Sequence, residues 1–291
     1  GSNPRWEAAV LNARIRKAYI NNDCMVGLIG KSVDLTYKYS HLSNDVSYLN
    51  KILKGDSEFS KISENAKKPL IIIGTSAINY EDGENVLKLC SEISHKYNVS
   101  NENFNGLNIL QQDISRVGAL DIGFYNNKFD KNWSSNIKEE IEKNKPVVFL
   151  LGLDDVDLSI LEHSFVVYIG HHGDSGAQIA DIILPSPAFP EKTSTFVNME
   201  GRVLQTTKCF HPIGDSKDEW KIFRALSNQI NKKLKFNNLE ELRTEVINKF
   251  QNFKELNKLP KNNSLLFKSS NEIGIKNIEF NISNFYMTDS I

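Results

Sequence analysis

The chain has 291 residues, of which 40% are hydrophobic and 24% charged, and these fractions are ordinary for a globular protein. Thirty-five Lys and Arg residues against 36 Asp and Glu residues give a formal net charge of −1, so the charge balance indicates neither a nucleic-acid partner nor an anionic membrane surface. No apolar run approaches the roughly 18 residues of a membrane span, so we expect no direct membrane insertion.

The first predicted element is a helix over residues 4–19. Pro4 is favoured in the first turn of a helix, where its missing N–H is not needed. Apolar residues then recur at spacings of three and four, which places them on one face of the helix. They are Ala8, Leu11, Ile15 and Ala18.

Short apolar strands alternate with helices along the next part of the chain. The strands are predicted at residues 24–29, 70–73, 147–151, 165–169 and 179–184, and the helices at 45–53, 83–97 and 136–143. Several of these strands are apolar on both faces, which is typical of a parallel sheet covered by helices. We therefore predict an α/β fold in which a parallel sheet carries helices on both faces.

The pattern changes after residue 190. Thr, Ser, Phe and Val residues around a Gly201-Arg202 turn predict a hairpin over residues 191–206. Helices are predicted at 217–231 and 239–250, and a late strand or extended segment at 277–287. We divide the chain into an α/β region, residues 1–234, and a C-terminal helix with an extended docking segment, residues 235–291.

The three cysteines, Cys24, Cys90 and Cys209, lie far apart in the sequence and form no C-x-x-C pair. An iron–sulfur cluster usually takes four thiolates, several of them at short spacing. A disulfide framework takes an even, patterned set of cysteines. We therefore predict three buried or inert thiols, and neither a metal site nor an iron–sulfur cluster in this chain.

Two turns have the form of a small anion-binding site. Gly1-Ser2-Asn3-Pro4 precedes a helix and Gly74-Thr75-Ser76-Ala77 follows a strand, so each can present backbone N–H groups to a phosphate. Neither turn has the G-x-G-x-x-G spacing, and no P-loop occurs. A helix cap at residues 1–4 and a plain turn at 74–77 are the favoured interpretations, with ligand binding as the alternative.

His171, His172 and Asp174 follow a predicted strand at its carboxyl end, where open α/β sheets place ligands. Such residues can bind zinc or iron. Adjacent histidines do not share one face of a helix or strand, however, and no second carboxylate cluster is near. A polar loop held by hydrogen bonds is favoured over a metal site.

Other charged and aromatic residues also favour structural roles. Glu191, Lys192, Glu200 and Arg202 resemble an acid/base set, but their spacing suits a hairpin whose charges pair across the strands. The tryptophans are too far apart in the sequence to suggest a cofactor cage and are interpreted as core or docking aromatics. They are Trp6, Trp133 and Trp220. We predict no catalytic residue.

Several of these segments together resemble the molybdopterin oxidoreductase family. Gly1-Ser2-Asn3-Pro4 is similar to the G-[ST]-N-P turn that helps active members to bind the pterin dinucleotide cofactor. The sequence ADIILP at 180–185, Glu191-Lys192, Thr195 and NMEGR at 198–202 is similar to the family pattern A-D-[VI]-[VI]-L-P, E-K, T and N-x-E-G-R. The resemblance implies the α/β fold of that family.

Further segments, at residues 33–37, 170–174 and 285–291, resemble the mitochondrial branch of the family that forms the largest iron–sulfur subunit of respiratory complex I. Arg5-Trp6-Glu7 lacks the His-Pro that active members often carry, and no Cys or Ser is identifiable as a molybdenum ligand. The resemblance implies a framework that kept the fold and lost the cofactor. Gly1, Ser2, Asn3 and Pro4 would then form a vestigial cofactor turn.

The role implied by this resemblance is that of a non-catalytic scaffold in the peripheral arm of complex I, on the matrix side of the mitochondrial inner membrane. Activity, NADH:ubiquinone reduction coupled to proton translocation, would belong to the complex. The implied partners are other peripheral-arm subunits, including a cluster-bearing N-terminal half.

Because the chain opens on Gly1 and not on Met, we interpret it as part of a longer polypeptide. Iron–sulfur clusters are then expected in the missing region or in a partner chain. The alternatives are a fragment of an active molybdopterin-dependent oxidoreductase and a stand-alone nucleotide-binding module.

Overall fold

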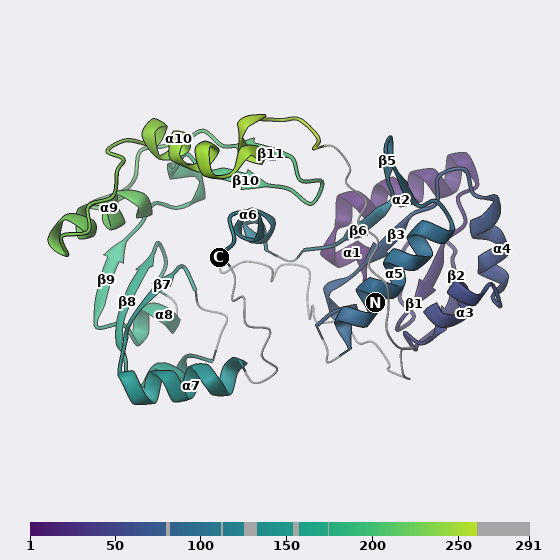
Figure 1. The fold of residues 1–291 in the computed structure, drawn as a ribbon, viewed down its shortest axis with the longest axis horizontal. Helices are drawn as coiled ribbons and strands as arrows, with labels where there is room; N and C mark the ends of the chain where they lie inside the picture. The colour runs from purple at the N-terminus through teal and green to yellow at the C-terminus, as the bar shows by residue number, and fades with distance from the viewer. Residues whose placement is uncertain (80–81, 112, 125–132, 154–156, 174, 261–291) are drawn as a thin grey trace. The chain divides into compact units, whose positions relative to one another are not determined.

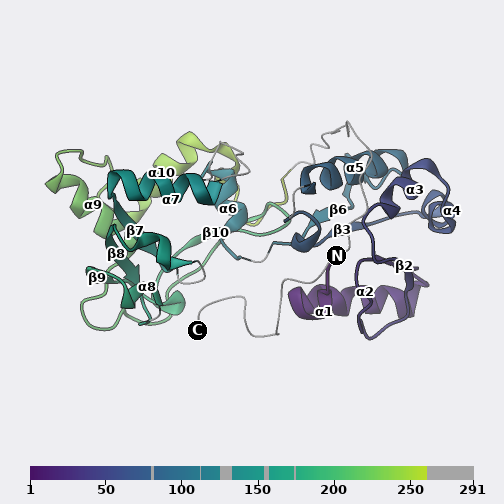
Figure 2. The ribbon, with the colours of Figure 1, turned by 90° about the horizontal axis from the view of Figure 1, so that it is seen from below.

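The computed structural model describes residues 1–79, 82–111, 113–124, 133–153, 157–173 and 175–260, and the side chains of 133–137 are not described (Figure 1). The chain divides into two compact units. The N-terminal unit includes Gly1–Arg116 and the C-terminal unit includes Val117–Lys258. Figure 2 shows the same ribbon from a second direction.

The N-terminal unit alternates helices with short strands. Its elements are α1 (Pro4–Glu7), α2 (Ala9–Asn22), β1 (Gly27–Ile29), β2 (Ser40–Ser43), α3 (Tyr48–Lys54), α4 (Glu58–Asn65), β3 (Ile71–Ile73), η1 (Thr75–Ala77), α5 (Gly83–Lys96), β4 (Ser100–Asn101), β5 (Phe104–Asn105) and β6 (Leu107–Ile109).

Parallel strand pairs and one central helix organise this unit. Strand β1 pairs in parallel with β2, and β3 pairs in parallel with β6, while β4 and β5 form a small antiparallel pair. Helix α5 places apolar residues three or four positions apart, so they form one stripe and enter the core together. They are Val86, Leu89, Cys90 and Ile93.

The C-terminal unit contains the remaining elements. They are α6 (Arg116–Asp121), α7 (Trp133–Asn144), β7 (Val147–Leu151), η2 (Leu158–Leu161), β8 (Phe165–Gly170), α8 (Ser175–Gln178), β9 (Ile182–Pro185), η3 (Phe189–Glu191), β10 (Thr195–Val197), β11 (Val203–Gln205), α9 (Glu219–Gln229), α10 (Leu239–Lys249) and η4 (Gln251–Lys254).

A three-stranded parallel sheet in the order β7–β8–β9 forms the first half of this unit. On one face of the sheet, Leu150 and Tyr168 pack with Ile141 of α7 and Leu161 of η2. On the other face, the ring of Phe149 lies 5.8 Å from that of Phe223 in α9. Helices therefore contact both faces of the sheet.

Part of the second face stays exposed. Val147 and Leu151 lie on the same face as Phe149 because side chains alternate along a strand, and they are 57% and 48% exposed. Phe165 and Ile182, on the neighbouring strands, are 45% and 44% exposed. We call these four residues, Val147, Leu151, Phe165 and Ile182, the open sheet face.

The hairpin of β10 and β11 is the core of a second packed cluster in the C-terminal unit. Its register pairs Val197 with Val203, and both side chains are buried with Phe253. The turn is held by Asn198, whose Oδ1 accepts hydrogen bonds of 3.0 Å from the backbone N–H groups of Glu200 and Arg202. The hairpin predicted from the sequence is thus confirmed.

The α/β class with parallel strands is also confirmed, with several short sheets in place of one long sheet. The predicted helix over residues 4–19 is interrupted at Ala8, where φ is −152° and ψ is 64°. Its predicted apolar face is correct, since Leu11, Ile15 and Ala18 are half-buried.

Some elements of the structure were missed by the sequence analysis, and some predictions are not tested by it. Helices α4, α6 and α8 and strands β2, β4, β5 and β6 were not predicted. The predicted segment at 277–287 lies outside the described residues, and the division at 234/235 stays a prediction. Within the part of the chain that the structure describes, no helix has both the length and the apolar character to cross a membrane.

Candidate functional site

Residues 1–4 lie at the carboxyl ends of β1 and β3. The Gly1 nitrogen donates a 2.6 Å hydrogen bond to the carbonyl oxygen of Ile29, the last residue of β1. The Gly1 carbonyl accepts a hydrogen bond from the hydroxyl of Ser76, in the short helix that follows β3. The two turns that were separate candidates in the sequence therefore meet, at the end of the strands where open α/β sheets bind ligands.

Gly74 makes this close approach possible. A Cβ atom at position 74 would lie 2.2 Å from the Gly1 carbonyl oxygen and 2.8 Å from the Cβ of Ser2. Both distances are far below van der Waals contact, so only glycine fits where the backbone of the first turn crosses the second.

The turn also caps α1. The carbonyl oxygen of Asn3 accepts from the backbone N–H groups of Trp6 and Glu7, each at 2.9 Å. In return, Glu7 Oε1 accepts from the backbone N–H of Asn3 at 2.7 Å. A carboxylate thus takes the backbone donor that an anionic ligand would need, and its negative charge opposes a phosphate there. In this arrangement the turn does not fit the phosphates of a pterin dinucleotide.

Three buried side-chain oxygens at or near the turn have no hydrogen-bond partner among the residues that the structure describes: Ser2 Oγ, Asn3 Oδ1 and Asn12 Oδ1. Their residues are 6%, 7% and 6% exposed. Buried polar groups without partners cost free energy, so these oxygens are the one feature of the turn that favours a bound small molecule or ordered water.

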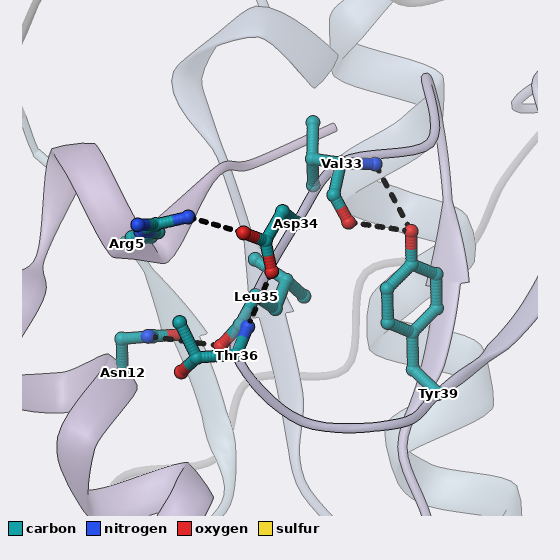
Figure 3. Close-up of polar contacts among 7 residues, drawn as sticks. All are labelled: Arg5, Asn12, Val33, Asp34, Leu35, Thr36 and Tyr39. Atoms are coloured by element: carbon teal, nitrogen blue, oxygen red, sulfur yellow. Dashed lines mark hydrogen bonds and ion pairs between the residues drawn. The ribbon is translucent and has the colours of Figure 1, made fainter.

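The loop after β1 is tied to the first two helices (Figure 3). Arg5 of α1 binds the Asp34 carboxylate at 2.5 Å, and Asn12 of α2 donates a 3.2 Å hydrogen bond to the carbonyl oxygen of Leu35. The Thr36 N–H, 2.9 Å from Asp34 Oδ1, and the Arg5 guanidinium hold the pKa of Asp34 below its usual value.

Tyr39 holds the same loop from the other side. Its hydroxyl donates to the Val33 carbonyl oxygen at 2.7 Å and accepts from the Val33 N–H at 3.0 Å (Figure 3). A single phenol therefore satisfies both backbone groups of one residue, as a neighbouring strand would. The loop is thereby fixed next to the turn.

The histidine pair does not form a metal centre with residues that the structure describes. His171 and His172 are exposed, and their rings lie edge to face with centroids 4.5 Å apart. Asp174, the third predicted ligand, lies outside the described residues. Within the described ranges no three His, Cys, Asp or Glu side chains are grouped as metal ligands would be.

The cysteines occupy three different environments. Cys90 is buried, Cys24 is half-buried and Cys209 is exposed, and none forms a disulfide. Burial in the α5 core raises the pKa of the Cys90 thiol to about 12. A thiol that stays neutral at physiological pH is a poor nucleophile and a poor metal ligand.

The predicted pairing of charges across the hairpin is wrong. Lys192 binds Glu219 at the start of α9, with 2.7 Å between Nζ and Oε1, and so ties the hairpin to that helix. Glu200 and Arg202 lie within the same turn, with 3.5 Å between Glu200 Oε2 and Arg202 Nε. Glu191 accepts a 2.9 Å hydrogen bond from the backbone N–H of Ala188. Lys192 thus pairs with another element, Glu200 and Arg202 pair within one turn, and Glu191 caps a short helix, so the four charged residues stabilise local structure at separate places.

The tryptophans belong to separate environments as well. Trp6, on α1, is 41% exposed. Trp220, on α9, is half-buried, and its ring lies 6.3 Å from that of Phe236. The side chain of Trp133 is not described. Trp6 and Trp220 lie in different units, so they form no common aromatic site.

Comparison with known proteins assigns the chain to one family. Residues 1–229 match the molybdopterin oxidoreductase family. The chain is 41% identical to the NADH-ubiquinone oxidoreductase 75 kDa subunit of Reclinomonas americana, over the whole chain and 42% of that protein. It is 40% identical to the mitochondrial 78 kDa subunit of Neurospora crassa, over 85% of the chain and 32% of that protein.

A bacterial protein is similar over the same extent. The chain is 35% identical to an NADH-quinone oxidoreductase subunit of Rickettsia bellii, over the whole chain and 41% of that protein. The chain therefore spans less than half the length of each of these relatives.

Proposed function

Because the chain belongs to the molybdopterin oxidoreductase family, and its relatives are named as subunits of NADH-ubiquinone oxidoreductase, we propose that it is a non-catalytic scaffold within such a complex. In this role it supports electron transfer from NADH to ubiquinone, coupled to proton translocation, without carrying a redox group. Enzyme activity belongs to the complex as a whole.

The geometry of the turn at residues 1–4 carries the non-catalytic part of this proposal. The Gly1 nitrogen donates a hydrogen bond to the Ile29 carbonyl, and the Gly1 carbonyl accepts one from the Ser76 hydroxyl. The Glu7 carboxylate accepts a hydrogen bond from the Asn3 N–H. These contacts fill the vestigial cofactor turn, Gly1, Ser2, Asn3 and Pro4, with protein groups. The framework is thus closed where active members of the family would receive a pterin.

A scaffold role needs rigid packing more than reactive groups. Protein interiors are packed as densely as organic crystals, so an α/β unit built around α5 holds its surface in a fixed shape. Electron tunnelling depends on fixed distances between clusters, and a rigid support preserves them. The clusters themselves would lie in protein outside this chain, either in a cluster-bearing N-terminal region or in a partner.

The partners proposed on this basis are peripheral-arm subunits of the complex, and the proposed location is the matrix side of the mitochondrial inner membrane. The relatives from Neurospora crassa and Candida albicans are named as mitochondrial. Those names support the mitochondrial part of this proposal.

The second candidate is a fragment of an active molybdopterin-dependent oxidoreductase. The oxygens of Ser2, Asn3 and Asn12, which have no partner in the described part of the chain, are the observation that favours it. The carboxylate of Glu7 at the turn weighs against it, because it repels phosphate.

One purification tests both candidates. The chain is tagged in cells that make it, and membranes solubilised in mild detergent are separated on a native gel. We expect the chain to migrate in the band that stains for NADH dehydrogenase activity. We also expect molybdenum, measured by inductively coupled plasma mass spectrometry, and pterin fluorescence to be far below one per chain.

A chain that migrates alone, away from that band, contradicts the scaffold proposal. Molybdenum and pterin at one per chain support the second candidate.

A further inference from the structure

The exposed side of α2 carries a stripe of three apolar residues and one lysine, with further positive charges beside it. Val10, Ala13, Lys17 and Ile20 follow one another at spacings of three, four and three, so they lie on one face of the helix. All four are exposed, Val10 at 79% and Ile20 at 60%. We call them the α2 stripe. In Figure 2, α1 and α2 run along the lower edge of the N-terminal unit.

The charges around this stripe have one sign. Arg14 and Arg16 flank it on opposite sides, and Lys17 lies within it, while α2 contains no Asp or Glu. Arg14, Arg16 and Lys17 form no ion pair with any residue that the structure describes. By contrast Arg5, on the preceding helix α1, is bound to Asp34.

We infer that the α2 stripe docks an α-helix of a partner subunit that carries its own apolar stripe flanked by Asp and Glu. The spacing matches the apolar seam by which two helices pack side by side. The unpaired positive charges supply complementarity to acidic flanks, which gives specificity and speeds association. This inference rests on the proposed function, because the partner is a subunit of the same assembly.

Two other occupants fit less well. A second copy of the chain, docked symmetrically, would place the same surface against itself, and Arg14, Arg16 and Lys17 would face like charges. An anionic membrane would attract those charges, but interfacial helices bury a broad apolar face. Here only Val10 and Ile20 are large apolar side chains on the exposed face.

The test uses the full chain in cells whose own copy has been removed. The triple variant R14E/R16E/K17E reverses the charges of α2. The matched control, K232E/K233E/K235E, makes the same change in charge at exposed lysines of the C-terminal unit. Because all six residues are exposed, both variants are expected to fold, and thermal unfolding of the purified chains checks this.

We expect the α2 variant to be recovered in the NADH-dehydrogenase band at about one tenth of the wild-type level, since three exposed ion pairs together are worth about one factor of ten. The control variant is expected to be recovered at the wild-type level. A photo-crosslinking p-benzoylphenylalanine at position 10 should join the chain to a partner peptide rich in Asp and Glu. The same group at Ile213, 81% exposed in the C-terminal unit, should not label that peptide.

Several outcomes overturn the inference. They are recovery of the α2 variant at the control level, crosslinking at position 10 to lipid or to a second copy of the chain, and crosslinking to a peptide without acidic residues. If the wild-type chain is itself absent from the band, the proposed function fails and this inference fails with it. If the wild type is present and the α2 variant is equally present, only the inference fails.

Discussion

Gly74 shows how one missing side chain fixes the position of a turn far away in the sequence. Its backbone φ of −80° is acceptable to any residue, so a side chain would be excluded only by contact with Gly1 and Ser2. The sequence indicated a turn at residues 74–77, but the hydrogen bond between Ser76 and Gly1 joins residues 75 positions apart. Local patterns carry no information about a contact of that separation.

We predict that Gly74→Ala lowers the free energy of unfolding by about 1–3 kcal/mol, the usual cost of forcing an extra methyl group into a packed site. Urea denaturation followed by circular dichroism measures the change. Gly173→Ala is the matched control, because a Cβ there meets no atom of the described residues within 4 Å. Equal stability of the two variants would show that the first turn moves aside without cost.

The second prediction at this scale concerns the thiols. Cys90 is buried and its pKa is raised to about 12, so at pH 8 it is a neutral thiol without access to reagents. Cys209 is exposed. We expect iodoacetamide to alkylate Cys209 in the folded chain and to reach Cys90 only in urea, as mass spectrometry of the digested protein would show. Alkylation of both residues at the same rate without denaturant would contradict the buried position of Cys90.

Among the elements, strands bounded by strong signals were predicted best. Residues 147–151 follow Lys145-Pro146 and precede Gly152, and β7 has those bounds. Strand β2, with the sequence Ser-His-Leu-Ser, has no apolar run and forms because it pairs with β1. The break between α1 and α2 was also missed, because alanine does not by itself end a helix. The Glu7 carboxylate accepts a hydrogen bond from the Asn3 N–H, a contact that the local pattern did not indicate.

Helix α10 illustrates a cap whose effect can be measured. Asn238 Oδ1 accepts from the Glu241 N–H at 2.9 Å, and its Nδ2 donates to Glu241 Oε1 at 2.8 Å. We predict that Asn238→Ala lowers the free energy of unfolding by about 1 kcal/mol. Asn248→Ala, at an exposed position in the same helix, should leave it unchanged or raise it slightly, because Ala has the higher helix propensity. Urea denaturation of both variants distinguishes them, and equal losses would exclude a special role for the cap.

For the molecule as a whole, the open sheet face and the small net charge both favour self-association of the purified chain. The open sheet face presents Val147, Leu151, Phe165 and Ile182 to solvent. The isoelectric point is near 6.7, so the net charge that keeps molecules apart is small at neutral pH. We expect the purified chain to self-associate most strongly near that pH.

The double variant V147K/L151K is expected to reduce light scattering of the purified chain near pH 6.7. The control I213K/I230K adds the same charge at exposed apolar residues of the C-terminal unit outside the sheet. A similar reduction by both variants would assign the effect to charge alone, and no reduction by either would exclude the sheet as the surface responsible.

The open sheet face also has a consequence for the life of the chain inside a cell. Quality-control chaperones and proteases recognise uncovered apolar surface, and newly made chains that find no companion stay available to them. The amount of this chain at steady state should therefore follow the supply of whatever protein covers those strands, even when its own synthesis is unchanged.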